Sequence, residues 1–161
     1  MKNKTLNLIF TLLTTIYFFI AYIFILPSGS FMFDEGMYLG TSWLLEQGVT
    51  LYTGIGFPYG PILPKLYEFV FWITGDIQLF HLRLLGLFSI ILLGTLSFMI
   101  AKQLSKNHSS SLIAPLTLYL GLGLFQSCRF SASLLAGVFS LSMLFIHLRD
   151  IHRPNPIKFA F

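Results

Sequence analysis

The feature that most constrains this chain is a series of long apolar runs separated by short polar segments. The first run, residues 6–26, follows Lys2 and Lys4 and contains no charged side chain. Its length matches the roughly 20 residues that a helix needs to cross the hydrocarbon core of a bilayer. The apolar region of a secretory signal peptide is shorter, about 7 to 15 residues, so we interpret this run as an uncleaved membrane anchor.

Later apolar runs predict further spans. Residues 84–101 predict a second span, residues 112–126 a short third span, and residues 130–148 a fourth, followed by a tail at residues 149–161. Charged residues make up 10% of the 161 residues, whereas soluble domains are about a quarter charged. We therefore predict an all-α, polytopic membrane protein with about four transmembrane helices in a single membrane domain. The single cysteine excludes an internal disulfide.

The segment between the first two spans, residues 27–80, has a different composition. It contains five of the six acidic residues and four of the seven prolines. The pattern predicts a helix at residues 34–47 that ends at Gly48. It also predicts a second helix at residues 61–74 with two prolines in its first turn. At about 14 residues, this second helix is too short to span and is expected to be re-entrant or interfacial.

The distribution of basic residues predicts the orientation in the membrane, because Lys and Arg near span ends are retained on the cytoplasmic side. With four spans, seven basic residues fall on one side and three on the other. The seven are Lys2, Lys4, Lys102, Lys106, Arg149, Arg153 and Lys158, and the three are Lys65, Arg83 and Arg129. We predict a plasma-membrane (bacterial inner-membrane) protein with both termini in the cytoplasm and the loop at residues 27–80 outside. The net charge of +4 then reflects topology, and the scattered basic residues do not form a nucleic-acid-binding surface.

Asp34 and Glu35 are the strongest candidates for chemistry, since they follow the first span closely. Carboxylates at the membrane boundary are costly unless they are solvated or used, so they indicate a functional site. In the alternative interpretation, Asp34 caps the helix and Glu35 complements its dipole. Met37 stands where a full capping box requires Glu or Gln. Both interpretations stay open, as does the question of which carboxylate faces a site.

The three basic residues on the outer side are candidates for binding a phosphate. The guanidinium groups of Arg83 and Arg129 can neutralise a phosphate through paired hydrogen bonds. A Lys or Arg near a helix end can instead extend to lipid headgroups, which we favour for Lys65. Tyr59 lies in a proline-rich turn and is expected at headgroup level. The four histidines show no metal-ligand spacing.

An ordered pattern connects these segments. An acidic pair opens the predicted outer helix, a Leu-Tyr loop and a proline-rich turn follow, and an Arg-Leu pair precedes the second span. The residues are Asp34, Glu35, Tyr38, Gly40, Leu44, Leu45, Gly48, Leu51, Tyr52, Pro58, Tyr59, Gly60, Pro61, Ile62, Leu63, Arg83 and Leu84. This order resembles the N-terminal part of GT-C fold membrane glycosyltransferases of the protein O-mannosyltransferase and aminoarabinose transferase kind (glycosyltransferase family 39).

The resemblance implies transfer of a sugar from a polyprenyl-phosphate donor to a lipid, glycan or protein acceptor of the cell envelope. By this resemblance Asp34 is the catalytic carboxylate and Glu35 its partner, while Arg83 supports the loop or binds the lipid phosphate. Tyr59, Lys65 and Arg129 are the other expected substrate-binding residues. No cofactor is predicted, and a requirement for a divalent metal and the oligomeric state are left open. Since the match covers only the opening third of a typical member, we expect a truncated enzyme.

The chain also departs from the family pattern. Many members have a Lys directly before the paired prolines and an acid after the arginine of the second outer loop, and here both are missing. The alternative function is a non-enzymatic, four-span accessory or flippase-like protein for polyprenyl-linked sugars. The long loop at residues 27–80 argues against it, because such proteins usually have short loops. A transporter fragment would predict more ionisable residues near the bilayer midplane than this sequence contains.

Overall fold

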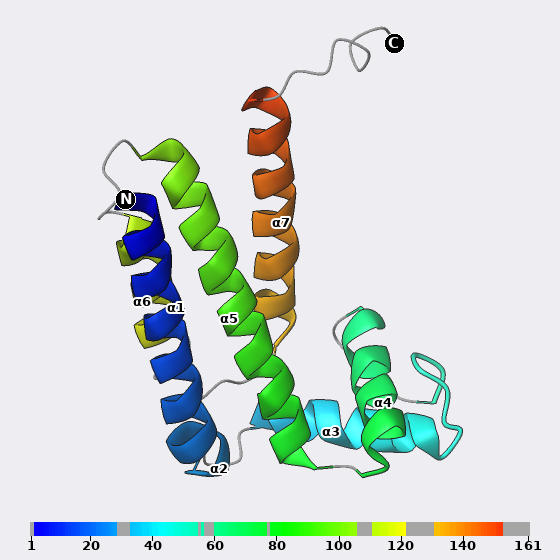
Figure 1. The fold of residues 1–161 in the computed structure, drawn as a ribbon. Coiled ribbons are helices and arrows are strands. Elements are labelled where there is room, and N and C mark those ends of the chain that lie inside the picture. The colour runs from blue at the N-terminus through cyan, green and yellow to red at the C-terminus, as the bar shows by residue number, and fades with distance from the viewer. Residues whose placement is uncertain are drawn as a thin grey trace, which may run out of the picture.

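The structure, a computed structural model, describes residues 2–28, 33–54, 56, 60–76, 78–105, 111–121 and 131–152. The regular elements in these ranges are all helices (Figure 1). They are α1 (Lys2–Ile20), η1 (Ala21–Ile25), α2 (Leu26–Ser28), α3 (Phe33–Glu46), α4 (Ile62–Thr74), α5 (Leu79–Leu104), α6 (Ile113–Leu118) and α7 (Ala132–His152). The all-α prediction is therefore confirmed for the described part of the chain.

Three helices are long and apolar enough to cross a membrane: Lys4–Ile25, Leu79–Leu104 and Ser133–Ile151. The first combines α1 with η1, a short π-helical segment in which the N–H of Leu26 donates to the carbonyl of Ala21. These helices correspond to the first, second and fourth predicted spans. The chain thus has the features of a multi-pass membrane protein, as its apolar runs predict.

The predicted third span, residues 112–126, is described only in part. Residues 111–121 form one irregular helical segment around α6, and residues 122–126 lie outside the described residues. At 1.5 Å per residue, this segment covers roughly 16 Å of the ~30 Å hydrocarbon core. The described segment alone is too short to cross, so the count of four spans stays a prediction.

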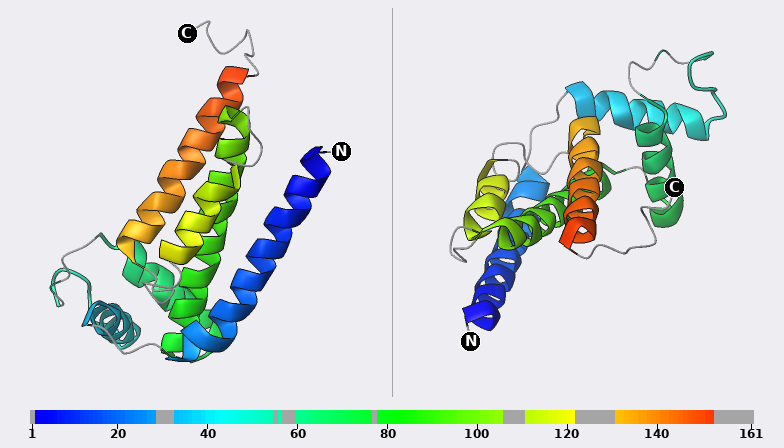
Figure 2. Two further views of the ribbon diagram at one scale, coloured as in Figure 1. Left: turned by 90° about the vertical axis from the view of Figure 1, so that its left-hand side faces the viewer. Right: turned by 90° about the horizontal axis from the view of Figure 1, so that it is seen from above.

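The long helices lie side by side, with α3 and α4 at one end of the bundle (Figures 1 and 2). The N-terminus of α1 and the C-terminal ends of α5 and α7 lie together at the opposite end. This arrangement of ends is the one that the distribution of basic residues requires. Which side of a membrane each end faces stays a prediction.

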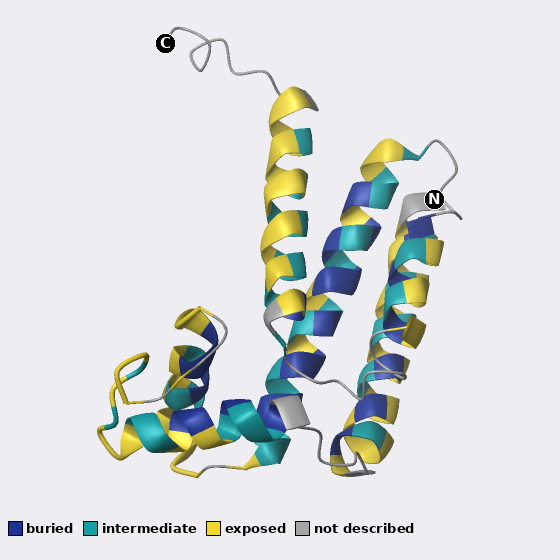
Figure 3. Cartoon of the chain, turned by 180° about the vertical axis from the view of Figure 1, so that it is seen from behind, coloured by how far each residue is buried: buried dark blue, intermediate teal, exposed yellow. Residues whose placement is uncertain are grey.

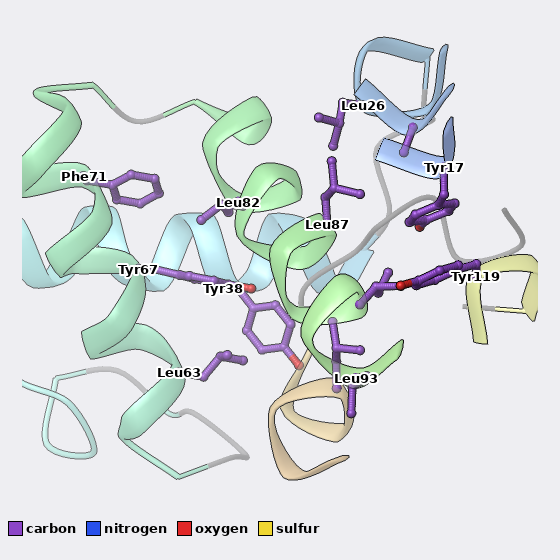
Figure 4. Close-up of a cluster of buried hydrophobic side chains, with 13 residues drawn as sticks. Tyr17, Leu26, Tyr38, Leu63, Tyr67, Phe71, Leu82, Leu87, Leu93 and Tyr119 are labelled. Atoms are coloured by element: carbon purple, nitrogen blue, oxygen red, sulfur yellow. The ribbon is translucent and has the colours of Figure 1, made fainter. Parts of the chain in front are cut away.

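A close contact among α1, α5 and α6 holds one side of the bundle together (Figure 4). The ring of Tyr119 stacks on Tyr17 with the ring centroids 4.5 Å apart. Its hydroxyl also lies 3.1 Å from the hydroxyl of Thr14. A Cβ atom at Gly94 would come within 2.4 Å of the Tyr119 ring. The glycine therefore allows this aromatic pair to pack directly against the backbone of α5.

Helices α3 and α4 pack on each other, and both contact the first turns of α5. Ser42 of α3 is fully buried, and its hydroxyl donates to the carbonyl of Tyr38 at 2.9 Å. The same hydroxyl lies 3.4 Å from the carbonyl of Pro64, at the start of α4. Figure 3 shows buried positions along the whole length of α5 and on parts of α3 and α4, whereas most of α7 is exposed. Helices α3 and α4 therefore form a packed unit at one end of the bundle, which we call the platform.

Candidate functional site

The platform helix α3 begins at Phe33 and ends at Glu46, close to the predicted 34–47. Gly48 follows in a left-handed conformation with φ of 83°, as expected for a glycine after a helix end. The helix start places Asp34 and Glu35 in the first turn. Asp34 is already helical, so it is not the residue that precedes the helix and caps it.

Glu35 forms a buried ion pair with Arg83 of α5. The Arg83 Nε donates to Oε1 of the carboxylate, and Nη2 donates to Oε2, both at 3.1 Å. The side chains are only 3% exposed for Arg83 and 6% exposed for Glu35. Two parallel N–H···O bonds to one carboxylate combine charge with a fixed orientation, and are stronger than single neutral hydrogen bonds. Glu35 thereby fixes the start of α3 against the start of α5.

The same guanidinium reaches the end of the first membrane helix. Nη1 of Arg83 donates to the backbone carbonyl of Leu26 at 3.2 Å. The α2 segment ends at Ser28, so this carbonyl is among the last four of the helix, which have no partner within it. Arg83 therefore joins three elements, α2, α3 and α5, through a single buried side chain.

Two buried tyrosines lie beside this ion pair. Tyr38 of α3 and Tyr67 of α4 meet edge to face, with ring centroids 5.7 Å apart (Figure 4). Burial is the main cause that raises the pKa of Tyr67 well above its usual value, and the nearby Tyr38 and Glu35 raise it further. Tyr67 is therefore held in its neutral form even at a pH at which an exposed tyrosine ionises.

Lys65 is placed differently from Arg83. It lies on the exposed face of α4, with its side chain 59% exposed, and its Nζ is 2.6 Å from Oε2 of Glu68. This is an i, i+3 pair at the surface, and such pairs contribute little to stability. The structure does not bring Lys65 together with the Glu35–Arg83 pair.

The other predicted site residues are described in part or not at all. For Asp34 the structure describes the helical backbone alone, while Tyr59 and Arg129 lie outside the described residues. Within the described ranges, no group of three or more His, Cys, Asp or Glu side chains is placed to hold a metal ion.

The structure assigns a partner to Glu35, the second of the two adjacent carboxylates. Glu35 is engaged in a closed, charge-neutral pair, so its immediate contribution is structural. Arg83 links the end of α2 to the start of α3, and its predicted role in binding a lipid phosphate stays a prediction. Sequence reasoning missed Tyr67, because a tyrosine in a short apolar helix is indistinguishable from an interfacial tyrosine until the packing is known.

The chain was also compared with known proteins. No family model, no curated protein and no solved structure matches it.

Proposed function

We propose that this chain forms the first part of a membrane glycosyltransferase that acts at the outer surface of the plasma membrane. The donor is a sugar linked to a polyprenyl phosphate, and the acceptor is a lipid, glycan or protein of the cell envelope. The order of motifs from Asp34 to Arg83 suggests this function. Four spans, the GT-C fold and cytoplasmic termini are part of the same proposal.

The observation that carries the proposal is the buried Glu35–Arg83 pair. It supports the idea of a rigid platform that begins with an acidic residue at the end of a membrane-crossing helix. A carboxylate contributes most to catalysis when its backbone is held in a fixed position, because misplacement by about 1 Å can lower a rate by a factor of 100. The pair provides such rigidity to the turn of α3 that contains Asp34.

In the proposed reaction, the acceptor hydroxyl attacks the anomeric carbon of the donor sugar. The new C–O bond forms as the bond from that carbon to the phosphate oxygen breaks, and the polyprenyl phosphate leaves with the electron pair. Asp34 takes the proton of the hydroxyl as general base. Because the reaction is a single direct displacement, the configuration at the anomeric carbon is inverted. Since Arg83 is engaged with Glu35, we assign the stabilisation of the leaving phosphate to Arg129, with Tyr59 and Lys65 at the outer surface.

Two isosteric variants of the full-length protein test this assignment. Cells that lack the gene are complemented with the wild type, Asp34→Asn or Glu35→Gln, and envelope lipids, glycans and proteins are compared by mass spectrometry. We expect Asp34→Asn to accumulate to normal levels while the sugar modification is lost. Glu35→Gln should lower the protein level and the modification together, because it removes half of a buried ion pair.

The exposed Gln47 supplies a control, since Gln47→Glu changes charge on the same platform without touching the pair. Gln47→Glu should retain both the normal protein level and the sugar modification. Normal modification with Asp34→Asn at a normal protein level would exclude Asp34 as the base. Deletion of the gene could instead leave every acceptor with its normal sugars and change only how polyprenyl-linked sugars are distributed between the two leaflets. That result would favour the accessory or flippase-like alternative.

A further inference from the structure

A second feature lies at the opposite end of the bundle from the platform. A groove of about 550 Å³ separates α1 from α5 near the N-terminus of α1, and its size is typical of ligand-binding clefts. Figure 2 shows that the two helices are close at the α2 end and diverge towards the N-terminus. The lining residues are Asn7, Phe10, Thr11, Thr95, Phe98, Met99, Lys102 and Gln103.

The chemistry of the groove changes along its length. At the inner part, Phe10 and Phe98 stack with ring centroids 4.2 Å apart. The hydroxyls of Thr11 and Thr95 donate to the carbonyls of Asn7 and Ile91 on their own helices. Because these hydroxyls are already bonded to backbone, this part of the groove is effectively apolar.

The outer part of the groove is polar and basic. Lys102 lies where the uncharged stretch of α5, residues 84–101, ends. Its Nζ donates to Oδ1 of Asn7 at 3.0 Å and lies 5.9 Å from the centroid of the Phe98 ring. An ammonium has three N–H donors, and this hydrogen bond uses one of them. None of the described residues that line the groove is acidic.

We propose that this groove binds an anionic phospholipid of the surrounding membrane, with the phosphate at Lys102 and an acyl chain along Phe10, Phe98 and Met99. Two observations select this occupant. The groove has a cation, Lys102, at its outer part and apolar side chains at its inner part. A phospholipid has its charged phosphate and its acyl chain in the same order. The groove also lies at the end of a helix that is long and apolar enough to cross a membrane, at the end of the bundle that we propose to be cytoplasmic. Basic pockets between membrane helices on that side bind anionic headgroups. This site is independent of the proposed transferase activity.

The test is a lipid titration of the whole chain in a non-ionic detergent, followed by native mass spectrometry. The probes are palmitoyl-oleoyl phosphatidylglycerol, phosphatidylcholine with the same acyl chains, and glycerol 3-phosphate. We expect tighter binding of phosphatidylglycerol than of phosphatidylcholine. Glycerol 3-phosphate, which lacks the chains, should not bind detectably over the same concentration range. Equal binding of the two lipids, or binding of glycerol 3-phosphate as tight as that of phosphatidylglycerol, would overturn the proposal.

Two variants locate the site. Lys102→Gln should weaken phosphatidylglycerol binding about five-fold, the factor expected for the loss of one basic residue near an anionic surface, and Lys102→Arg should restore it. Gln103→Glu adds an opposing charge without removing the hydrogen bond between Lys102 and Asn7, so it remains informative if Lys102→Gln fails to fold. The matched control is Gln47→Glu at the other end of the molecule, which should leave the affinity unchanged. An unchanged affinity in Gln103→Glu, or the same loss in Gln47→Glu, would place the binding elsewhere.

Discussion

Replacing Glu35 with Gln removes the negative charge of the buried pair and keeps nearly the same side-chain volume. Arg83 would then keep its hydrogen bond to the carbonyl of Leu26, while the bidentate contact with the carboxylate is lost. Hydrogen bonds to charged groups contribute about 1.5 to 3 kcal/mol each. Breaking a buried ion pair costs about 3 to 5 kcal/mol. Since Gln can still accept one N–H, we expect Glu35→Gln to lower the free energy of unfolding by about 3 kcal/mol.

A double-mutant cycle separates the pair from other effects of each substitution. Arg83→Met removes the cation and fills most of the space, and we expect a loss of about 3 kcal/mol in the free energy of unfolding because the buried Glu35 carboxylate loses its countercharge. In the double variant neither charge of the pair remains. Its loss of unfolding free energy should therefore be smaller than the sum of the losses in the two single variants, by about 2 kcal/mol or more. The free energies are measured by reversible unfolding in mixed micelles with increasing sodium dodecyl sulfate, followed by circular dichroism.

The exposed pair Lys65–Glu68 provides an internal comparison, because its lysine side chain is 59% exposed. Lys65→Met should cost less than about 1 kcal/mol, as for other surface pairs. The reasoning would be refuted if Glu35→Gln were as mild as Lys65→Met. It would also be refuted if the losses in the Glu35 and Arg83 variants were additive, since additive losses mean that the two side chains do not interact.

Three further predictions concern other parts of the structure. Gly94→Ala should lower the free energy of unfolding by about 1 to 3 kcal/mol, because the added methyl group overlaps the stacked tyrosine ring. Gly137→Ala, whose nearest added contact is 3.6 Å away, should not lower it. The pKa of Tyr67 is raised in the folded protein. Its neutral form therefore contributes stability below about pH 10, and this contribution is lost as the pH rises further. Above this pH, the free energy of unfolding should fall more steeply in the wild type than in Tyr67→Phe. In a cysteine-free background, cysteines at Gln47 and Ser105 should react with an impermeant maleimide from opposite sides of the membrane, and labelling of both from one side would contradict the topology.

Some of the fold could be predicted because it depends on local properties of the sequence. The length of an apolar run determines whether a helix can cross a bilayer, and the three described helices that are long and apolar enough to cross one coincide with predicted runs. The end of α3 was predicted within one residue, because Gly48 supplies the left-handed conformation that terminates a helix. The predicted start of the next helix, at residue 61, is one residue before the start of α4 at Ile62. This start could be predicted because prolines are tolerated in the first turn of a helix.

The contacts between distant residues could not be predicted in this way. Glu35 and Arg83 are 48 positions apart, and both had several plausible partners, including the helix dipole, lipid headgroups and a bound phosphate. Gly94 gave no signal either, because glycine is common in membrane helices. Its importance depends on Tyr119, which lies in the predicted third span, residues 112–126, and the structure describes that segment only as far as residue 121. Such pairings are set by three-dimensional packing, for which one sequence contains no direct evidence.

The way in which α3 is attached also determines how the candidate site must be tested. Its buried face includes the polar residues Glu35, Thr41 and Ser42, while Trp43 is half exposed. Since Tyr38 of this helix is also buried in the hydrophobic core, its attachment combines apolar packing with hydrogen bonds, including those of Arg83. A substitution of Glu35 or Arg83 would weaken the attachment of α3, which contains Asp34, to α5. A loss of activity in such a variant would therefore say little about the catalytic chemistry. Only a substitution that removes activity and leaves the unfolding free energy unchanged identifies a catalytic group, and among the two adjacent carboxylates we expect that result for Asp34 alone.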